Sequence, residues 1–170
     1  MTLPPSRYRL HPVDRHDPDA LAALLEVYRQ CEDFLALGPR AYASVEMVLA
    51  DLETAQVAGR MYCGVYACPL GELIGVTDYL SAGFDGVPQH AFLELLMIAL
   101  HFRGQGLGSQ IVADLEEEIL KDPQIRAIRL GVQENNPGAL RFWQRCGYSI
   151  IRPAELMPDQ TIAYLMEKLF

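Results

Sequence analysis

The sequence predicts an α+β fold in which a mixed, mostly antiparallel sheet of six to seven strands is flanked by about four helices. Two segments of helical periodicity alternate with short apolar segments in the second half of the chain, which indicates β-helix-β crossovers. Two apolar segments separated by Pro-Leu-Gly at 69–71 indicate an antiparallel hairpin. The 170 residues, 51% of them apolar, are expected to form a single domain, 1–170, with a substantial core.

The first half of the chain is predicted to contain one strand, two helices and the hairpin. Asp17 followed by Pro18 is typical of a helix start, because Asp caps free amides and Pro fits the first helical turn. Apolar residues at helical spacing continue to Tyr28, and a second helix is expected to begin after Ser44. The strands expected in this half cover 8–13, 60–68 and 72–80.

The second half is predicted to contain two helices and four strands. The long apolar run at 91–100 indicates a strand buried on both faces. Helices are expected over 106–121 and over 137–147, where Gly147 ends the helical pattern. The other expected strands cover 126–132, 148–152 and 161–170.

The overall composition narrows the classes of partner. The formal net charge is −8, and nucleic acids and anionic membranes need a basic face, so we expect neither as a partner. The first ten residues contain no apolar signal core, and the longest apolar run is too short to cross a bilayer. We therefore expect a cytoplasmic protein. Its four cysteines lack Cys-x-x-Cys or zinc spacing, so the sequence predicts core cysteines and no metal site.

Three glycines at alternate positions lie in the stretch HFRGQGLGSQI, residues 101–111, between a predicted strand and a predicted helix. The stretch matches neither the P-loop pattern nor the dinucleotide-binding Gly-x-Gly-x-x-Gly pattern. A strand-to-helix turn nevertheless presents free N–H groups at the positive end of a helix dipole. Arg103 and Ser109 would add donors, so the turn suits a pyrophosphate. The alternative is a tight turn whose glycines serve only the backbone dihedrals.

Two motifs resemble those of a known family. The residues from Arg103 to Gly108, Arg-Gly-Gln-Gly-Leu-Gly, resemble the Arg/Gln-x-x-Gly-x-Gly/Ala motif of the GNAT superfamily, the acetyl-coenzyme A-dependent N-acyltransferases. The segment NNPGALRFWQRCGY, 135–148, resembles the second motif of that family. Its matching positions are Asn136, Ala139, Gly147 and Tyr148. The resemblance covers the region from Phe92 to Tyr148 and implies a GNAT-like fold with acetyl-coenzyme A as co-substrate.

The resemblance also implies a cofactor site. The backbone amides of the 103–108 turn would hold the coenzyme A pyrophosphate, and the strand ending at Leu100 would splay from the strand at 126–132. The backbone groups left free by that splay would bind the pantetheine arm, with the amide of Ile98 polarising the thioester carbonyl. The implied cofactor-binding residues are Leu96, Ile98, Leu100, Arg103, Gly104, Gln105, Gly106, Leu107, Gly108, Ser109, Asn136 and Trp143.

Two of these residues also have ordinary structural explanations. Asn136 would contact the cofactor arm, but Asn before Pro is equally a good helix cap. Trp143 occupies the position where many family members have a tyrosine that protonates the leaving thiolate. An indole cannot act as that acid, so Trp143 would pack beside the cofactor or in the core. The acid is left open between Tyr164, Tyr148, water and an unprotonated thiolate.

Glu94 is the candidate general base. An alkyl ammonium has a pKa of about 10 and must lose a proton before it attacks a thioester. Regular strand alternation would place Glu94 on one face with Leu96 and Ile98, and a carboxylate in an apolar run is costly unless it is paired or useful. The alternative is a structural ion pair or a solvent-facing end. The rival bases are Asp78, Glu32, Asp33 and His101.

The acceptor site is expected near 30–39, which joins the first two helices. Glu32 and Asp33, with Asp78 as a further candidate, would attract a cationic amine, unless they form a solvated helix end. The sequence thus predicts an N-acetyltransferase that acts on a small-molecule or peptide amine. The alternatives are a noncatalytic acyl-coenzyme A-binding module and a transferase for another acyl group. Pairing of edge strands, or exchange of the last strand, would give a homodimer.

Overall fold

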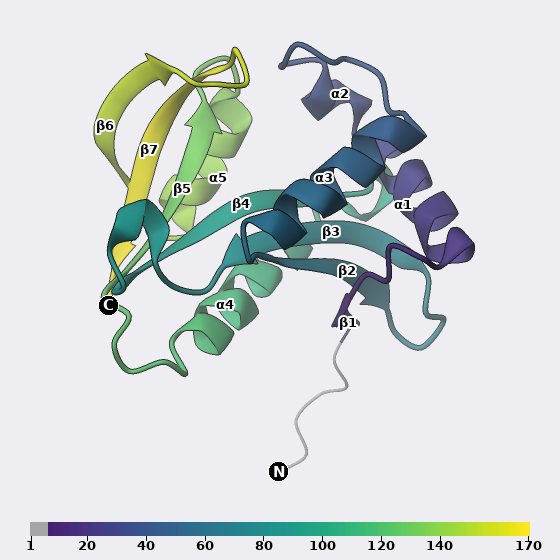
Figure 1. The fold of residues 1–170 in the computed structure, drawn as a ribbon, viewed down its shortest axis with the longest axis horizontal. Helices are drawn as coiled ribbons and strands as arrows, with labels where there is room; N and C mark the ends of the chain where they lie inside the picture. Colours follow the sequence, from purple (N-terminus) through teal and green to yellow (C-terminus); the bar gives the residue numbers. More distant parts are fainter. Residues whose placement is uncertain (1–6) are drawn as a thin grey trace.

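A computed structural model describes residues 7–170; the first six residues, for which the sequence predicts no signal segment, lie outside them. The described chain forms one seven-stranded sheet with the strand order β1-β2-β3-β4-β5-β7-β6 (Figure 1). Neighbouring strands are antiparallel except β4 and β5, which are parallel. The strands are β1 (Tyr8–Pro12), β2 (Met61–Ala67), β3 (Leu73–Leu80), β4 (His90–Ile98), β5 (Ala127–Gln133), β6 (Ser149–Leu156) and β7 (Ile162–Leu169). The predicted mixed, mostly antiparallel sheet is confirmed.

The helices are α1 (Pro18–Gln30), α2 (Glu32–Leu35), α3 (Val45–Val57), α4 (Leu107–Ile119) and α5 (Pro137–Arg145). The two predicted helix starts are confirmed by their caps. The Asp17 carboxylate accepts from the Asp19 amide at 3.0 Å, and the Ser44 hydroxyl accepts from the Met47 amide at 3.1 Å. Helix α2 was not predicted, because four residues are too few to show helical periodicity.

The helices cover the two faces of the sheet and form two separate cores. One core lies between the sheet and α4 and α5, and it includes Ile111, Leu130 and Trp143. The other lies beneath α1 and α3 and includes Leu24, Val48 and Met97. Figure 1 shows α1 and α3 on the face of the sheet opposite α4. Strand β4 contributes to both cores, because its side chains point to both faces of the sheet.

Strands β4 and β5 separate along part of their length. They pair from His90 with Ala127 as far as Leu93 with Leu130, and β5 then continues to Gln133 against β7 alone. Figure 1 shows β4 and β5 diverging. The predicted splay is therefore present. Strand β4 ends at Ile98, so the expected strand to Leu100 is too long; Leu100 begins a short 3-10 turn, η2 (Leu100–Phe102).

Candidate active site

The three glycines of the turn between β4 and α4 are explained by two different physical requirements. Gly104 and Gly106 have φ angles of 73° and 78°, in the left-handed region where a side chain is strained. Gly108 allows close helix packing, because a Cβ there would lie 3.2 Å from a ring carbon of Phe142 in α5. The turn therefore favours glycine at 104 and 106 for the backbone and at 108 for packing, and it brings the start of α4 against α5.

The same turn leaves a row of backbone donors free. Gly106 caps α4 without a side-chain hydrogen bond, and within residues 7–170 the amides of 104–109 have no protein acceptor. The Arg103 amide is excluded from this row because it donates to the Leu100 carbonyl at 3.3 Å. Free amides at the positive end of a 13-residue helix form a cradle suited to a phosphate or pyrophosphate. The implied coenzyme A pyrophosphate fits this part of the chain.

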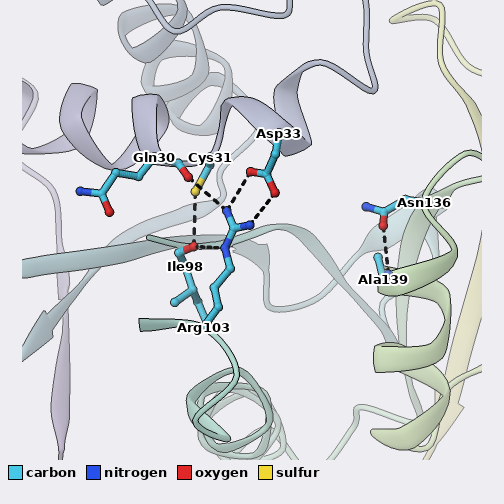
Figure 2. Close-up of polar contacts among 7 residues, drawn as sticks. All are labelled: Gln30, Cys31, Asp33, Ile98, Arg103, Asn136 and Ala139. Carbon is cyan, nitrogen blue, oxygen red and sulfur yellow. Dashed lines mark hydrogen bonds and ion pairs between the residues drawn. The ribbon is translucent and has the colours of Figure 1, made fainter. Parts of the chain in front are cut away.

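The Arg103 side chain points away from this cradle. Its Nε donates to the Ile98 carbonyl at 2.7 Å, and its two terminal nitrogens lie 2.6 and 3.1 Å from the Asp33 carboxylate oxygens (Figure 2). A terminal nitrogen also donates to the Gln30 carbonyl at 3.4 Å. The expectation that this guanidinium adds donors for the anion is therefore wrong, because protein acceptors on three segments already hold it.

The splay leaves amides of β4 directed into the gap beside β5. The Ala99 amide donates to the Ile74 carbonyl on β3 at 2.9 Å. Because amide directions alternate along a strand, the amides of Leu96 and Ile98 point to the other edge, where pairing with β5 has ended at Leu93. Strand amides that lose their partner strand are left to bind other acceptors. The carbonyls of an extended amide-containing chain would supply them, as the pantetheine arm has.

A β-bulge at Glu94 changes the expected side-chain alternation. Asp78 pairs with Leu95 and Tyr79 pairs with Leu93, so Glu94 has no partner residue on β3. Leu96 and Ile98 pack toward the α4–α5 core, whereas Leu95 packs toward the α1–α3 core. The expectation that Glu94 shares a face with Leu96 and Ile98 is wrong, because the extra residue turns its side chain to the α1–α3 side.

On that side Glu94 belongs to an acidic pair bridged by one arginine. Arg60, at the start of β2, places Nη1 3.3 Å from the Glu94 carboxylate and Nε 2.9 Å from the Asp78 carboxylate. The Glu94 side chain is 43% exposed and that of Asp78 is 3% exposed. Burial raises the pKa of Asp78 to about 7, against the opposing effect of Arg60. Glu94 is thus the accessible acid. Its ion pair with Arg60, a partner that could not be named from the sequence, is the structural alternative given for Glu94 and accounts for its place in an apolar strand.

The acids of the α1–α2 junction are held by the protein. The Glu32 carboxylate accepts from the Ala43 amide at 2.9 Å, which fixes the loop after α2. The bond to Arg103 lowers the pKa of Asp33, so this carboxylate is charged and paired. Attraction of a cationic acceptor by Glu32 or Asp33 stays a prediction, and His101 lies exposed in η2.

Residues of the second motif are placed mainly by packing. Asn136 caps α5 by accepting from the Ala139 amide at 3.0 Å (Figure 2), and its contact with the cofactor stays a prediction. Trp143 is 9% exposed and packs its ring against those of Phe142 and Tyr148. The Tyr148 hydroxyl donates to Glu116 at 3.0 Å, and burial raises the pKa of Tyr148. These contacts favour a core role for both aromatic residues.

The remaining residues of the predicted cofactor set lie around the turn. Gln105 donates from its side chain to the His101 carbonyl at 3.2 Å, and Leu107 is buried in the α4–α5 core. Tyr164 lies on β7 opposite Val132 of β5, near the open end of the splay. Its role as the acid stays a prediction.

Comparison with known proteins agrees with this geometry. Residues 21–148 match the acetyltransferase (GNAT) family. The chain belongs to this family. It is therefore an acyltransferase enzyme, and the matched range contains both sequence motifs, the cradle, the splayed strand and the Arg60 cluster. No curated protein sequence matches the chain.

Solved GNAT structures share the fold along the whole chain. An acetyltransferase from Thermus thermophilus is 23% identical with a TM-score of 0.78, covering 97% of this chain and 98% of its own. A ribosomal-protein-alanine N-acetyltransferase from Brucella melitensis is 18% identical with a TM-score of 0.67 and coverage of 95% and 99%. The spermidine N-acetyltransferase from Vibrio cholerae, solved with CoA and spermine, is 16% identical with a TM-score of 0.68 and coverage of 96% and 95%. At these identities the likeness concerns the fold.

Proposed function

We propose that this GNAT protein transfers an acetyl group from acetyl-coenzyme A to a primary amine by direct attack of the amine on the thioester. The observation that carries the proposal is the continuity between two sets of free backbone donors. The amides of 104–109 suit the pyrophosphate, and the amides of Leu96 and Ile98 border the gap where β4 leaves β5. An extended cofactor with phosphates at one end and amides along its arm fits both sets.

The Ile98 amide is the proposed donor to the thioester carbonyl. A donor fixed in a strand needs no reorganisation as negative charge develops on that oxygen, and one such donor contributes about a hundredfold to a thousandfold in rate. The carbonyl of the same residue is held by Arg103 and by the Cys31 thiol, at 2.7 and 3.4 Å. These bonds hold the peptide unit that follows the Ile98 amide, so they restrain the backbone at Ile98 before any ligand binds.

Glu94 is the proposed general base. Its carboxylate lies on the α1–α3 side, opposite α4, so an amine that enters from this side meets the base before the thioester. Glu94 takes the proton from the ammonium, directly or through water, and the neutral nitrogen attacks the acetyl carbon. The new C–N bond forms as the C–S bond breaks, and coenzyme A leaves as the thiolate. The nitrogen then releases its second proton to water, which leaves a neutral amide. Asp78 lies behind Arg60 with 3% side-chain exposure, which favours Glu94 over Asp78.

The acceptor is proposed to be a primary amine of a small molecule or of a peptide. The solved relatives include enzymes named for spermidine and for a ribosomal-protein alanine, and both names describe acceptors with an amino group. Glu94 and the charged acids of the junction would favour a cationic acceptor. A transferase for a longer acyl group uses the same donors, so acetyl- and longer acyl-coenzyme A need to be compared directly.

The first test is release of coenzyme A from acetyl-coenzyme A in the presence of a panel of polyamines, amino acids and short peptides. Glu94→Gln keeps the shape of the side chain and removes the base. Its kcat should fall by about a hundredfold or more at neutral pH, the scale of acid–base assistance. The loss should shrink at high pH, where more of the amine is already neutral.

Glu53→Gln, a change on the exposed surface of α3, is the matched control and should keep full activity. Full activity of Glu94→Gln at neutral pH would remove Glu94 from the mechanism. Binding of acetyl-coenzyme A without release by any amine would instead favour a noncatalytic binding protein.

A further inference from the structure

The Arg103 side chain links three parts of the proposed site. Its backbone is the last residue before the free amides of the cradle. Its guanidinium reaches the carbonyl of Ile98 at the end of β4, the carbonyl of Gln30 at the end of α1, and the carboxylate of Asp33 in α2 (Figure 2). Gln30 and Asp33 lie more than sixty positions from Arg103 in the sequence, whereas Ile98 lies five positions away. This one side chain therefore joins the end of β4 to a distant segment of the chain.

Each of these contacts has a clear chemical cause. The Gln30 carbonyl lies in the last turn of α1, where carbonyls lack helical partners and a cation is favoured. The Asp33 carboxylate meets the two terminal nitrogens, at 2.6 and 3.1 Å, in the paired geometry that a guanidinium provides. The remaining nitrogen, Nε, is then aimed at the Ile98 carbonyl. These contacts together fix the orientation of the planar guanidinium group.

The expected effect of Arg103 on stability is small compared with its expected effect on rate. The Arg103 side chain is 32% exposed and that of Asp33 is 61% exposed, and an exposed ion pair of this kind contributes about 0–1 kcal/mol to stability. Displacement of a reacting group by about 1 Å can cost about a hundredfold in rate. Loss of the contact with Asp33 should therefore affect turnover more than folding.

We infer that Arg103 is a positioning residue that holds the backbone at Ile98 and the α1–α2 junction in one arrangement, so that the proposed thioester donor and the acceptor side of the site stay in register. The inference rests on the proposed function for its kinetic readout. It does not require the Arg103 guanidinium to touch the cofactor or the amine. The Cys31 thiol, 3.4 Å from the same Ile98 carbonyl, supports this arrangement from the junction side.

Two substitutions of Arg103 remove different subsets of its contacts. Gln carries a nitrogen at the same distance along the side chain as the arginine Nε, so Arg103→Gln can keep the bond to Ile98 while it loses Gln30 and Asp33. Met has a similar length and no donor, so Arg103→Met loses all three. Asp33→Asn keeps the bond to Ile98 and weakens only the contact with the junction.

The rates of these variants should follow the contacts that each one keeps. The kcat of Arg103→Met should fall by about tenfold to a hundredfold. The kcat of Arg103→Gln should fall clearly less than that of Arg103→Met, because the Gln variant can keep the bond to Ile98. Arg103→Gln and Asp33→Asn should raise the KM of the amine by similar factors, because both loosen the α1–α2 junction. Binding of coenzyme A, measured by calorimetry, should change by less than about threefold in all variants, because the phosphate donors begin after Arg103.

Three results would overturn the inference. Equal kcat for Arg103→Met and Arg103→Gln would show that the bond to Ile98 does not position the site. Loss of coenzyme A binding in a folded variant would show that the guanidinium acts on the cofactor. If Arg103→Met does not fold, Arg103→Gln and Asp33→Asn carry the test, and a KM for the amine that rises in one of them alone would refute the linkage.

Failure of the proposed function can be recognised separately. If the unmodified protein binds coenzyme A but no amine releases it, hydrogen exchange still tests the inference without an acceptor. Amides of 30–35 should then exchange faster in Arg103→Gln and Asp33→Asn than in the unmodified protein, while the helix 107–119 is unchanged. Unchanged exchange at 30–35 would overturn the inference on its own.

Discussion

Asp78 gives a quantitative prediction, because its carboxyl is buried without full compensation. The residue is 2% exposed, and within residues 7–170 its Oδ1 accepts no hydrogen bond. Arg60 Nε lies 2.9 Å from Oδ2 but is not aligned as a hydrogen-bond donor. Burial is the main cause that raises the pKa of Asp78 to about 7, Arg60 opposes it, and the charges of Glu94 and Asp51 raise it further. The substitution Asp78→Asn keeps the shape and removes this titration.

The sign and size of the effect follow from the two pKa values. The pKa of Asp78 is 3.8 without burial and about 7 in the folded protein, so the folded state keeps a proton that the unfolded state releases. The resulting stability is fully present below pH 3.8 and is lost as the pH rises to about 7. A difference of about three pH units, at about 1.4 kcal/mol each, makes this loss about 4 kcal/mol.

Urea unfolding of both proteins between pH 5 and pH 8 measures this loss. The free energy of unfolding of the unmodified protein should fall relative to that of Asp78→Asn by about 2–3 kcal/mol over this range, and the difference should level off above pH 7. Subtracting one curve from the other cancels the contribution of the other carboxyl groups to the pH dependence. Parallel curves, or an Asn variant that is the less stable protein at pH 8, would show that Arg60 keeps Asp78 ionised and would refute the reasoning.

Two other predictions concern α4. Gly106→Glu places a carboxylate beside the cradle, so calorimetry should show that coenzyme A binding is largely lost. Gly106→Ala adds the same backbone strain without the charge, so it should bind coenzyme A more tightly than Gly106→Glu does. Equal affinities of the two variants would place the phosphates elsewhere. Glu116 accepts from Tyr148 at 3.0 Å and from Lys168 at 2.7 Å. Glu116→Ala should lower the free energy of unfolding by about 2–4 kcal/mol in urea titrations, and exposed Glu118→Ala by less than about 1 kcal/mol; equal losses would contradict a buried network.

The parts of the fold that depend on local signals could be predicted from the sequence. Asp17 and Ser44 mark helix starts because a cap bonds to amides two or three residues away. The glycine turn was recognisable because the left-handed backbone at Gly104 and Gly106 leaves little choice of residue. The splay at Leu93 came from the family resemblance alone, since no local pattern shows where two strands stop pairing.

The parts of the candidate site that depend on distant partners could not be predicted. Arg60 is one of many charged residues at a strand end, and only the fold brings it to Glu94 and Asp78. The guanidinium of Arg103 was expected at the phosphates because the neighbouring glycines suggested an anion, but Asp33 lies seventy positions away and holds it instead. The β-bulge was missed because one extra residue leaves the apolar run 91–100 unchanged in the sequence.

The bulge explains how one strand can serve both sides of the proposed reaction. Regular alternation would direct Glu94 to the face of Leu96 and Ile98, which pack toward α4 and its phosphate cradle. The extra residue turns Glu94 toward the α1–α3 side, while the amides of Leu96 and Ile98 still point into the gap. In the proposed reaction, a base on one side and a phosphate anchor on the other leave the thioester between them, where an amine can attack from the side opposite the anchor. The position of Glu94 on the proposed acceptor side therefore depends on an irregular register. Restoring regular pairing at Glu94 would remove the proposed base without changing a single residue of the 103–108 turn.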